Sequence, residues 1–143
     1  MIAITNGKVV TVTGETYEKG TVLVENDKIV AVGADVVVPE GAEVIDAEGC
    51  WVMPGLIDPH THISNFNEPR TMPSPPMDGN EMSGPIQSHV RAFDAVNPFD
   101  YAIDVVRKAG FSTVCILPGS GNPIGGTGTV IKLRNVATAE EME

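Results

Sequence analysis

The chain has 143 residues and a formal net charge of −10, because 19 Asp and Glu outweigh 9 Lys and Arg. Binding to a phosphate backbone requires clustered Lys and Arg, so this balance disfavours a nucleic-acid partner. No apolar run approaches the roughly 20 residues that a membrane-spanning helix needs, so we expect no membrane partner either. The length suits one modest domain.

The first third of the sequence has the pattern of short strands joined by turns. Asn6-Gly7 separates two apolar runs and predicts one hairpin, and Asn26-Asp27 predicts a second. Further short strands are expected over residues 43–46 and 50–53. We therefore predict a small β-sandwich segment over residues 1–53.

The run from Pro54 to His62 is the most informative part of the sequence. It predicts a buried strand on which His60 and His62 share one face, because side chains alternate along a strand. Two imidazoles on that spacing can bind one metal ion. Asp58 belongs to the same face, where it can orient a histidine or balance charge. The alternative is a pair of ordinary strand histidines without a metal, although a buried polar cluster is costly unless something satisfies it.

A long loop and two helices are expected next. Residues 64–85 hold five prolines and no periodic pattern, which predicts a loop. Residues 84–96 have apolar spacing that favours a short amphipathic helix. A clearer helix follows, with Asn97 as its cap and Gly110 at its end.

Residues 112–117 then predict a buried strand that runs parallel to the histidine strand. Strand, loop, helix and parallel strand make a βα unit. We therefore predict that residues 54–143 form the first βα units of a (β/α)₈ TIM-like barrel. The barrel is incomplete in this chain, since a whole one needs about 200 residues or more.

The motif Pro-Gly-x-x-Asp-x-His-x-His, placed after an all-β segment, resembles the first barrel strand of the amidohydrolase superfamily. The glycine-rich stretch 119–128 and the residues 94–98 resemble imidazolonepropionase-like members of that superfamily. The resemblance implies that this chain is the N-terminal portion of a larger enzyme. It also implies that the β segment pairs with strands contributed after the barrel.

The chemistry follows from the same resemblance. It implies a divalent metal, most simply Zn²⁺, with His60 and His62 as ligands and Asp58 behind them. A zinc-bound water has a pKa of about 7 and so supplies a hydroxide at neutral pH. Later parts of a family member supply the other ligands and the proton shuttle, so the catalytic base is expected outside this chain. His89 and Asn122 are candidate substrate contacts, although a solvated helix histidine is an alternative for His89.

The expected function is therefore hydrolysis of a C–N bond in a small molecule such as a non-peptide amide, a cyclic amide or a dipeptide-like compound. Two alternatives remain: a catalytically inert amidohydrolase-like scaffold for protein association, and a hydantoinase-like or deaminase-like hydrolase. The missing base predicts negligible activity of this chain alone. Open strand edges predict a complementary chain or self-association. Two cysteines without a Cys-x-x-Cys motif, and no signal-peptide pattern at the N-terminus, predict a cytoplasmic protein.

Overall fold

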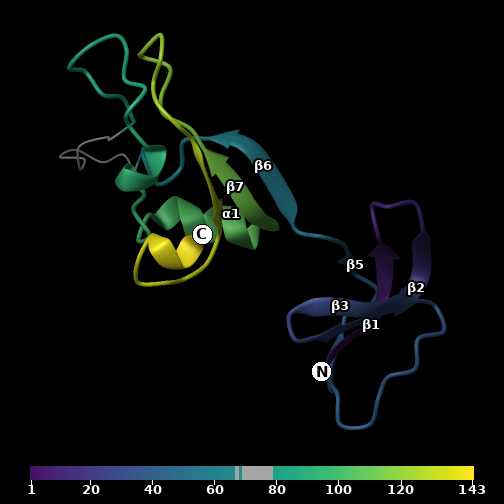
Figure 1. Cartoon of the computed structure of the whole chain (residues 1–143). Helices are drawn as coiled ribbons and strands as arrows, with labels where there is room; N and C mark the ends of the chain where they lie inside the picture. Colours follow the sequence, from purple (N-terminus) through teal and green to yellow (C-terminus); the bar gives the residue numbers. More distant parts are fainter. Residues whose placement is uncertain (67, 69–78) are drawn as a thin grey trace. The chain divides into compact units, whose positions relative to one another are not determined.

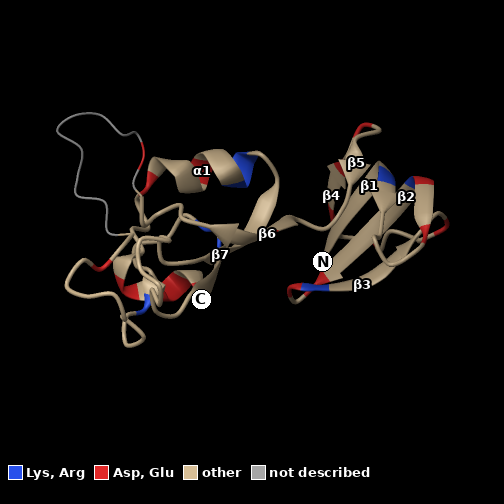
Figure 2. Ribbon diagram, turned by 90° about the horizontal axis from the view of Figure 1, so that it is seen from above, with Lys and Arg blue, Asp and Glu red and all other residues tan. Residues whose placement is uncertain are grey.

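The computed structural model describes residues 1–66, 68 and 79–143 and divides into two compact units, Met1–Pro54 and Gly55–Glu143 (Figure 1). Most of the predicted proline-rich loop therefore lies outside the described residues. Over the described part, no helix is both long and apolar enough to cross a membrane. Lys and Arg are few and are spread over both units (Figure 2).

The first unit is a single five-stranded mixed sheet with the order β3-β2-β1-β4, and β5 also pairs with β1. β2 runs antiparallel to β1, whereas β4 and β5 run parallel to it. The predicted β segment is confirmed, but its described residues form one sheet and not the two facing layers of a sandwich. The strands are β1 (Ile2–Val10), β2 (Thr16–Glu25), β3 (Lys28–Gly33), β4 (Glu43–Asp46) and β5 (Trp51–Val52).

One of the two predicted hairpins is wrong and the other is confirmed. β1 continues through Asn6-Gly7, where its register with β2 shifts and Asn6 adopts a φ of 58°. A β-bulge takes the place of the turn, and Gly7 is required there because a Cβ atom would lie 2.5 Å from Val52 Cγ2. Asn26 and Asp27 do form a hairpin turn, with positive φ at both residues as a two-residue type I′ loop demands.

The second unit contains the predicted βα unit. β6 (Leu56–Thr61) pairs in parallel with β7 (Phe111–Ile116), and α1 (Tyr101–Lys108) lies between them in sequence. β8 (Thr129–Lys132) then returns antiparallel to β7, so the element after β7 is a hairpin partner and not a second βα unit. A closed barrel is not present in the described residues.

The predicted helix over residues 84–96 is wrong. Only a 3₁₀ turn, η1 (Ala92–Ala95), forms there. The backbone before it pairs instead with the glycine-rich loop, through bridges from Ile86 to Ile124 and from Arg91 to Thr127. These backbone hydrogen bonds replace the helical ones, which explains why apolar spacing misled the prediction.

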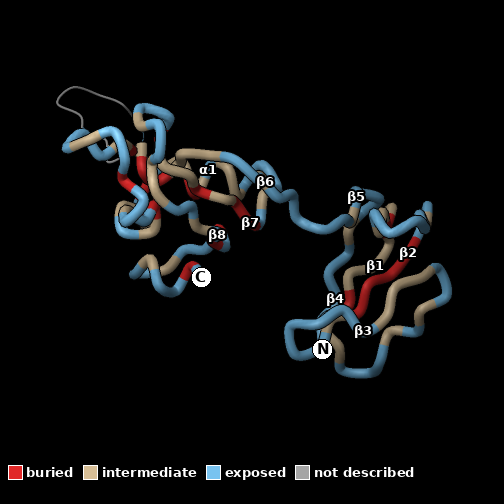
Figure 3. The backbone as a smooth tube through the Cα atoms, turned by 45° about the horizontal axis from the view of Figure 1, so that its top comes forward, coloured by how far each residue is buried: buried red, intermediate tan, exposed pale blue. Residues whose placement is uncertain are grey.

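The helix α1 begins later than its sequence pattern suggested. Its cap is Asp100, whose side chain accepts from the Ala102 N–H, whereas the Asn97 side chain accepts from the Phe99 N–H just before the helix. Gly110, with a φ of 99°, ends the helix as predicted. Its buried face packs onto β7 (Figure 3). The core of this unit consists of Ala92, Val96, Ile103, Val114, Ile116, Ile131, Leu133 and Met142, and a second 3₁₀ turn, η2 (Glu140–Met142), contributes the last of these.

The strand that carries the histidine motif is not buried in this chain, contrary to the prediction. Ile57 is 68% exposed and Leu56 is also exposed. β6 is an edge strand that pairs with β7 along one side in the described structure. Its apolar side chains therefore lack the covering layer that the sequence pattern implied. Cys50 is likewise exposed, and Cys115 is half-buried, with both thiols free.

Truncation of a buried side chain of α1 should cost more free energy of unfolding than truncation of an exposed one. Ile103 is 2% exposed and Val105 is 45% exposed on the same helix. We expect Ile103→Ala to lower the free energy of unfolding by about 2–5 kcal/mol, because it leaves a cavity against β7. Val105→Ala should change it by no more than about 0.5 kcal/mol. Urea melts measure both, and equal losses would contradict the packing described here.

Candidate metal and substrate site

The structure brings His60 and His62 together at the C-terminal end of β6. Their ring centroids lie 5.4 Å apart and their planes meet at 84°. The strand bulges at this point, because its register with β7 shifts between Asp58 and Thr61. The two imidazoles are thus neighbours on a strand end that is partly open to solvent.

Asp58 acts on the backbone of the motif. Its Oδ1 accepts a hydrogen bond of 3.0 Å from the His60 N–H. This bond spans Pro59, which has no N–H of its own, and it fixes the bulge locally. The described contact of Asp58 is therefore to the chain that carries the histidines and not to an imidazole ring.

The ring of His62 is oriented by a backbone carbonyl. Its Nδ1 lies 2.8 Å from the Leu117 oxygen, one residue beyond β7. A carbonyl only accepts, so Nδ1 carries the proton and donates it. Nε2 then holds the lone pair that a metal ion requires, and this use of the second ring nitrogen is typical of metal-bound histidines. Phe66 packs edge-on against the same ring, with centroids 5.4 Å apart.

These donors fit a divalent metal only as part of a ligand set. Among residues 1–66, 68 and 79–143, no three His, Cys, Asp or Glu side chains group closely enough to hold a metal ion. A catalytic zinc usually has three protein ligands. His60 and His62 supply two neutral nitrogen donors, so further donors must come from elsewhere for such a site to be complete.

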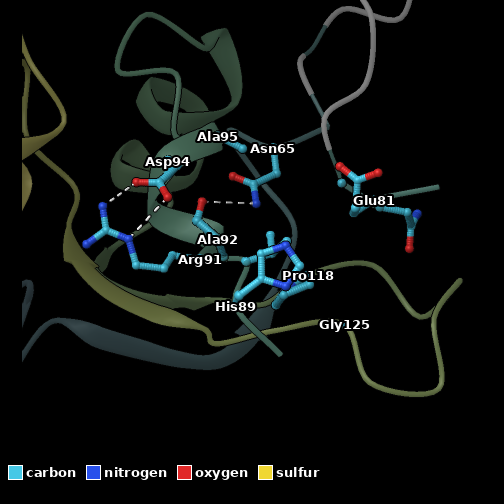
Figure 4. Close-up of a pocket in the computed structure, with 12 residues that line it drawn as sticks. Asn65, Glu81, His89, Arg91, Ala92, Asp94, Ala95, Pro118 and Gly125 are labelled. Carbon is cyan, nitrogen blue, oxygen red and sulfur yellow. Dashed lines mark hydrogen bonds and ion pairs between the residues drawn. The ribbon is translucent and has the colours of Figure 1, made fainter. Parts of the chain in front are cut away.

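A cavity of about 270 Å³ lies beside the turn that follows His62, and neither His60 nor His62 is among its lining residues (Figure 4). Asn65, three residues after His62, lines one side, and Pro118, next to the carbonyl that binds His62, lines another. His89 and Glu81 also contribute to its walls. The structure thus places the predicted substrate contact His89 at the wall of a cavity, in a turn and not on a helix.

Charged groups of this cavity are held by specific hydrogen bonds. Arg91 donates from Nε and from a terminal nitrogen to the two carboxylate oxygens of Asp94, at 3.1 and 2.5 Å. These bonds lower the pKa of the Asp94 carboxyl below its ordinary value. The backbone N–H of Ser83 likewise lowers the pKa of the Glu81 carboxyl. Both carboxyl groups are therefore ionised at neutral pH.

Asn122 does not line this cavity. Its Nδ2 donates to the carbonyl oxygens of Glu81 and Gly84, at 2.6 and 2.9 Å. It thereby ties the glycine-rich loop to the segment that carries Glu81. Asn122 therefore supports the backbone of a segment that lines the cavity.

Sequence reasoning missed several residues of this region, namely Asn65, Glu81, Arg91, Asp94 and Asp100. The spacing of Arg91 and Asp94 could have indicated an ion pair, because residues three apart meet on a helical turn. The positions of Asn65, Glu81 and Asp100 depend on contacts between segments far apart in sequence, for which no local pattern gives a signal.

The chain is similar to several amidohydrolases. The sequence profile described as Amidohydrolase family matches residues 43–108. The crystal structure of an amidohydrolase from Thermotoga maritima MSB8 is 40% identical, with a TM-score of 0.90, over 99% of this chain and 36% of that chain. Amidohydrolase tasK of Hapsidospora irregularis is 37% identical over 82 residues, which are 54% of this chain and 8% of that protein. A D-hydantoinase from Bacillus sp. AR9 is 47% identical over 45% of this chain and 13% of that chain, with a TM-score of 0.39.

The chain is similar to amidohydrolases, in its sequence profile over residues 43–108 and in structure over 99% of its length. It spans 36% of the length of the Thermotoga protein and 8% of the Hapsidospora protein.

The tautomer of His62 is directly measurable. We expect ¹⁵N NMR of the neutral ring to show a protonated Nδ1 and an unprotonated Nε2, because the Leu117 carbonyl accepts only from Nδ1. His89, which is exposed, serves as the internal comparison and should show a mixture of tautomers. A His62 ring protonated mainly on Nε2 would contradict the assigned hydrogen bond.

Proposed function

We propose that this chain forms the N-terminal part of a metal-dependent amidohydrolase that cleaves a C–N bond in a small molecule. The observation that carries the proposal is the His60–His62 pair, with the Nδ1 of His62 bound to a carbonyl and its Nε2 left for a metal. Similarity to amidohydrolases supports the reaction class. Zn²⁺ is the metal that best suits neutral imidazole donors in a hydrolase.

A bound divalent metal would supply a water of lowered pKa for attack on the substrate carbon. The residues of this chain prepare the place for it. The Leu117 carbonyl keeps the proton of His62 on Nδ1, and Asp58 fixes the backbone that presents His60. The remaining ligands and the catalytic base belong to further polypeptide.

The cavity beside the turn that follows His62 is the proposed place of the substrate. It is lined by the imidazole of His89, the carboxylate of Glu81 and the side chain of Asn65. These groups can donate hydrogen bonds to an amide or a cyclic amide and accept hydrogen bonds from it. Asn122 contributes indirectly, through its two hydrogen bonds to the segment of Glu81.

A second candidate is a catalytically inert scaffold of the same superfamily. The incomplete donor set in the described residues favours it. The two functions differ in whether metal binding depends on His60 and His62, since an inert scaffold has no need of either imidazole.

Metal titration separates the two functions. We expect the chain to bind Zn²⁺, and we expect the His60→Ala and His62→Ala variants each to bind it at least about tenfold more weakly, because each loses one of two ligands. His89→Ala is the matched control and should bind Zn²⁺ as the unaltered chain does. Competition with a chromophoric chelator measures the affinities, and turnover by the chain alone should be negligible. Equal affinity in all four proteins would favour the scaffold.

We also propose that the open apolar surfaces of both units are covered by a complementary chain or by a second copy. Ile29, Trp51 and Ile57 are exposed, and an apolar groove of about 740 Å³ lies on one face of the first sheet. Exposed apolar surface and unpaired strand edges favour association.

Light scattering and denaturant melts of the purified chain test this proposal. We expect oligomers whose unfolding midpoint rises with protein concentration, because association stabilises the folded state by mass action. A monodisperse monomer with a concentration-independent midpoint would refute it. Ile57→Lys should reduce association if the edge of β6 takes part.

A further inference from the structure

The turn that follows the histidine pair is held in an unfavourable backbone conformation. We call residues 62–66 the exit turn. Ser64, at its centre, is fully buried and has a φ of 72°, a backbone region that residues other than glycine rarely adopt. Such a conformation costs of order 1–3 kcal/mol and persists only where surrounding contacts impose it.

The contacts that impose it come from the start of α1. Asp100 is 4% exposed, and its Oδ2 accepts a hydrogen bond of 2.7 Å from the Ser64 N–H. The Ser64 hydroxyl donates to the Asn97 carbonyl at 2.9 Å and accepts from the Asn97 N–H at 2.6 Å. The exit turn is thus fastened to the helix N-terminus at three points.

Capping of the helix does not account for both oxygens of Asp100. Oδ1 alone accepts from the Ala102 N–H, and also from the Glu68 N–H, each at 3.0 Å. Ser, Thr or Asn would meet that requirement equally well. A buried carboxylate costs more than a neutral side chain, so the second oxygen has a separate task. That task is the bond to Ser64.

The exit turn is continuous with His62. The His62 carbonyl accepts from the N–H groups of Asn65 and Phe66, at 3.2 and 3.0 Å. Fixing Ser64 therefore fixes the backbone of His62, while the Leu117 carbonyl fixes the far side of its ring. These two sets of hydrogen bonds together fix the orientation of the His62 ring and therefore the position of its Nε2.

We propose that Asp100 and Ser64 are positioning residues, which hold the exit turn so that His62 presents Nε2 to a metal ion. The inference rests on the proposed function, since it assumes that His62 is a ligand. Rigid support of this kind is what raises the affinity of a metal site, and removal of outer partners typically costs about 10–100-fold in metal affinity.

Asp100→Asn is the sharpest test. The amide keeps an oxygen at the Oδ1 position, so Ala102 and Glu68 retain their acceptor, but an NH₂ group then faces the Ser64 N–H. We expect the variant to fold and to bind Zn²⁺ about tenfold more weakly than the unaltered chain, in competition with a chromophoric chelator. The matched control is Asp104→Asn on the same helix, which loses ion pairs with Arg107 and Lys108 without touching the exit turn. Its Zn²⁺ affinity should be unchanged.

The outcomes are distinct. An Asp100→Asn protein that melts at lower temperature but binds Zn²⁺ normally would show a purely structural role and overturn the inference, leaving the proposed function intact. If His60→Ala and His62→Ala also bind Zn²⁺ normally, the proposed function itself fails. Should Asp100→Asn not fold, Ser64→Ala takes its place, because it removes both hydroxyl bonds and retains Asp100. A severalfold loss of Zn²⁺ affinity would support the inference, and an unchanged affinity would overturn it.

Discussion

The parallel pairing of β6 with β7 is the constraint from which the rest of the second unit follows. Two parallel strands need a crossover, and α1 supplies it, with Ile103 packed into the core beside Val114 and Ile116. Parallel strands end at the same edge of their sheet. His62, just after β6, and the Leu117 carbonyl, just after β7, therefore meet, and their hydrogen bond is a consequence of the parallel strand direction.

Those parts of the fold that depend on local chemistry could be predicted from the sequence. Asn26-Asp27 makes its hairpin because both residues tolerate positive φ, and Gly110 ends α1 for the same reason. The proximity of His60 and His62 follows from their spacing in an extended segment. The helix, its parallel strands and their order also follow from apolar periods and turn residues.

The failures occur where distant contacts decide. Asn6-Gly7 has the composition of a hairpin, yet Val52 and Asp46 approach it and make a bulge favourable. Residues 84–96 have helical spacing, yet the glycine-rich loop offers their backbone groups partners across a gap of more than thirty positions in sequence. The contact of Asp100 with Ser64 could not be predicted for the same reason. An aspartate near a helix start indicates a cap, but it does not indicate what its second oxygen binds. The prediction that β6 is buried was wrong. Its apolar pattern indicates that a further layer packs on the strand, but the described residues of this chain do not supply that layer.

The antiparallel return of β8 restricts how this sheet can grow. β7 already has β6 on one side and β8 on the other, so neither of its edges can accept another strand. Any strand that extends the sheet must join at β6 or at β8, and only β6 offers a neighbour of the direction shared by β6 and β7. A closed ring of strands that keeps the pairing of β6 with β7 would therefore include β8 as an antiparallel member, and the histidine strand β6 would be the open edge at which such a ring closes.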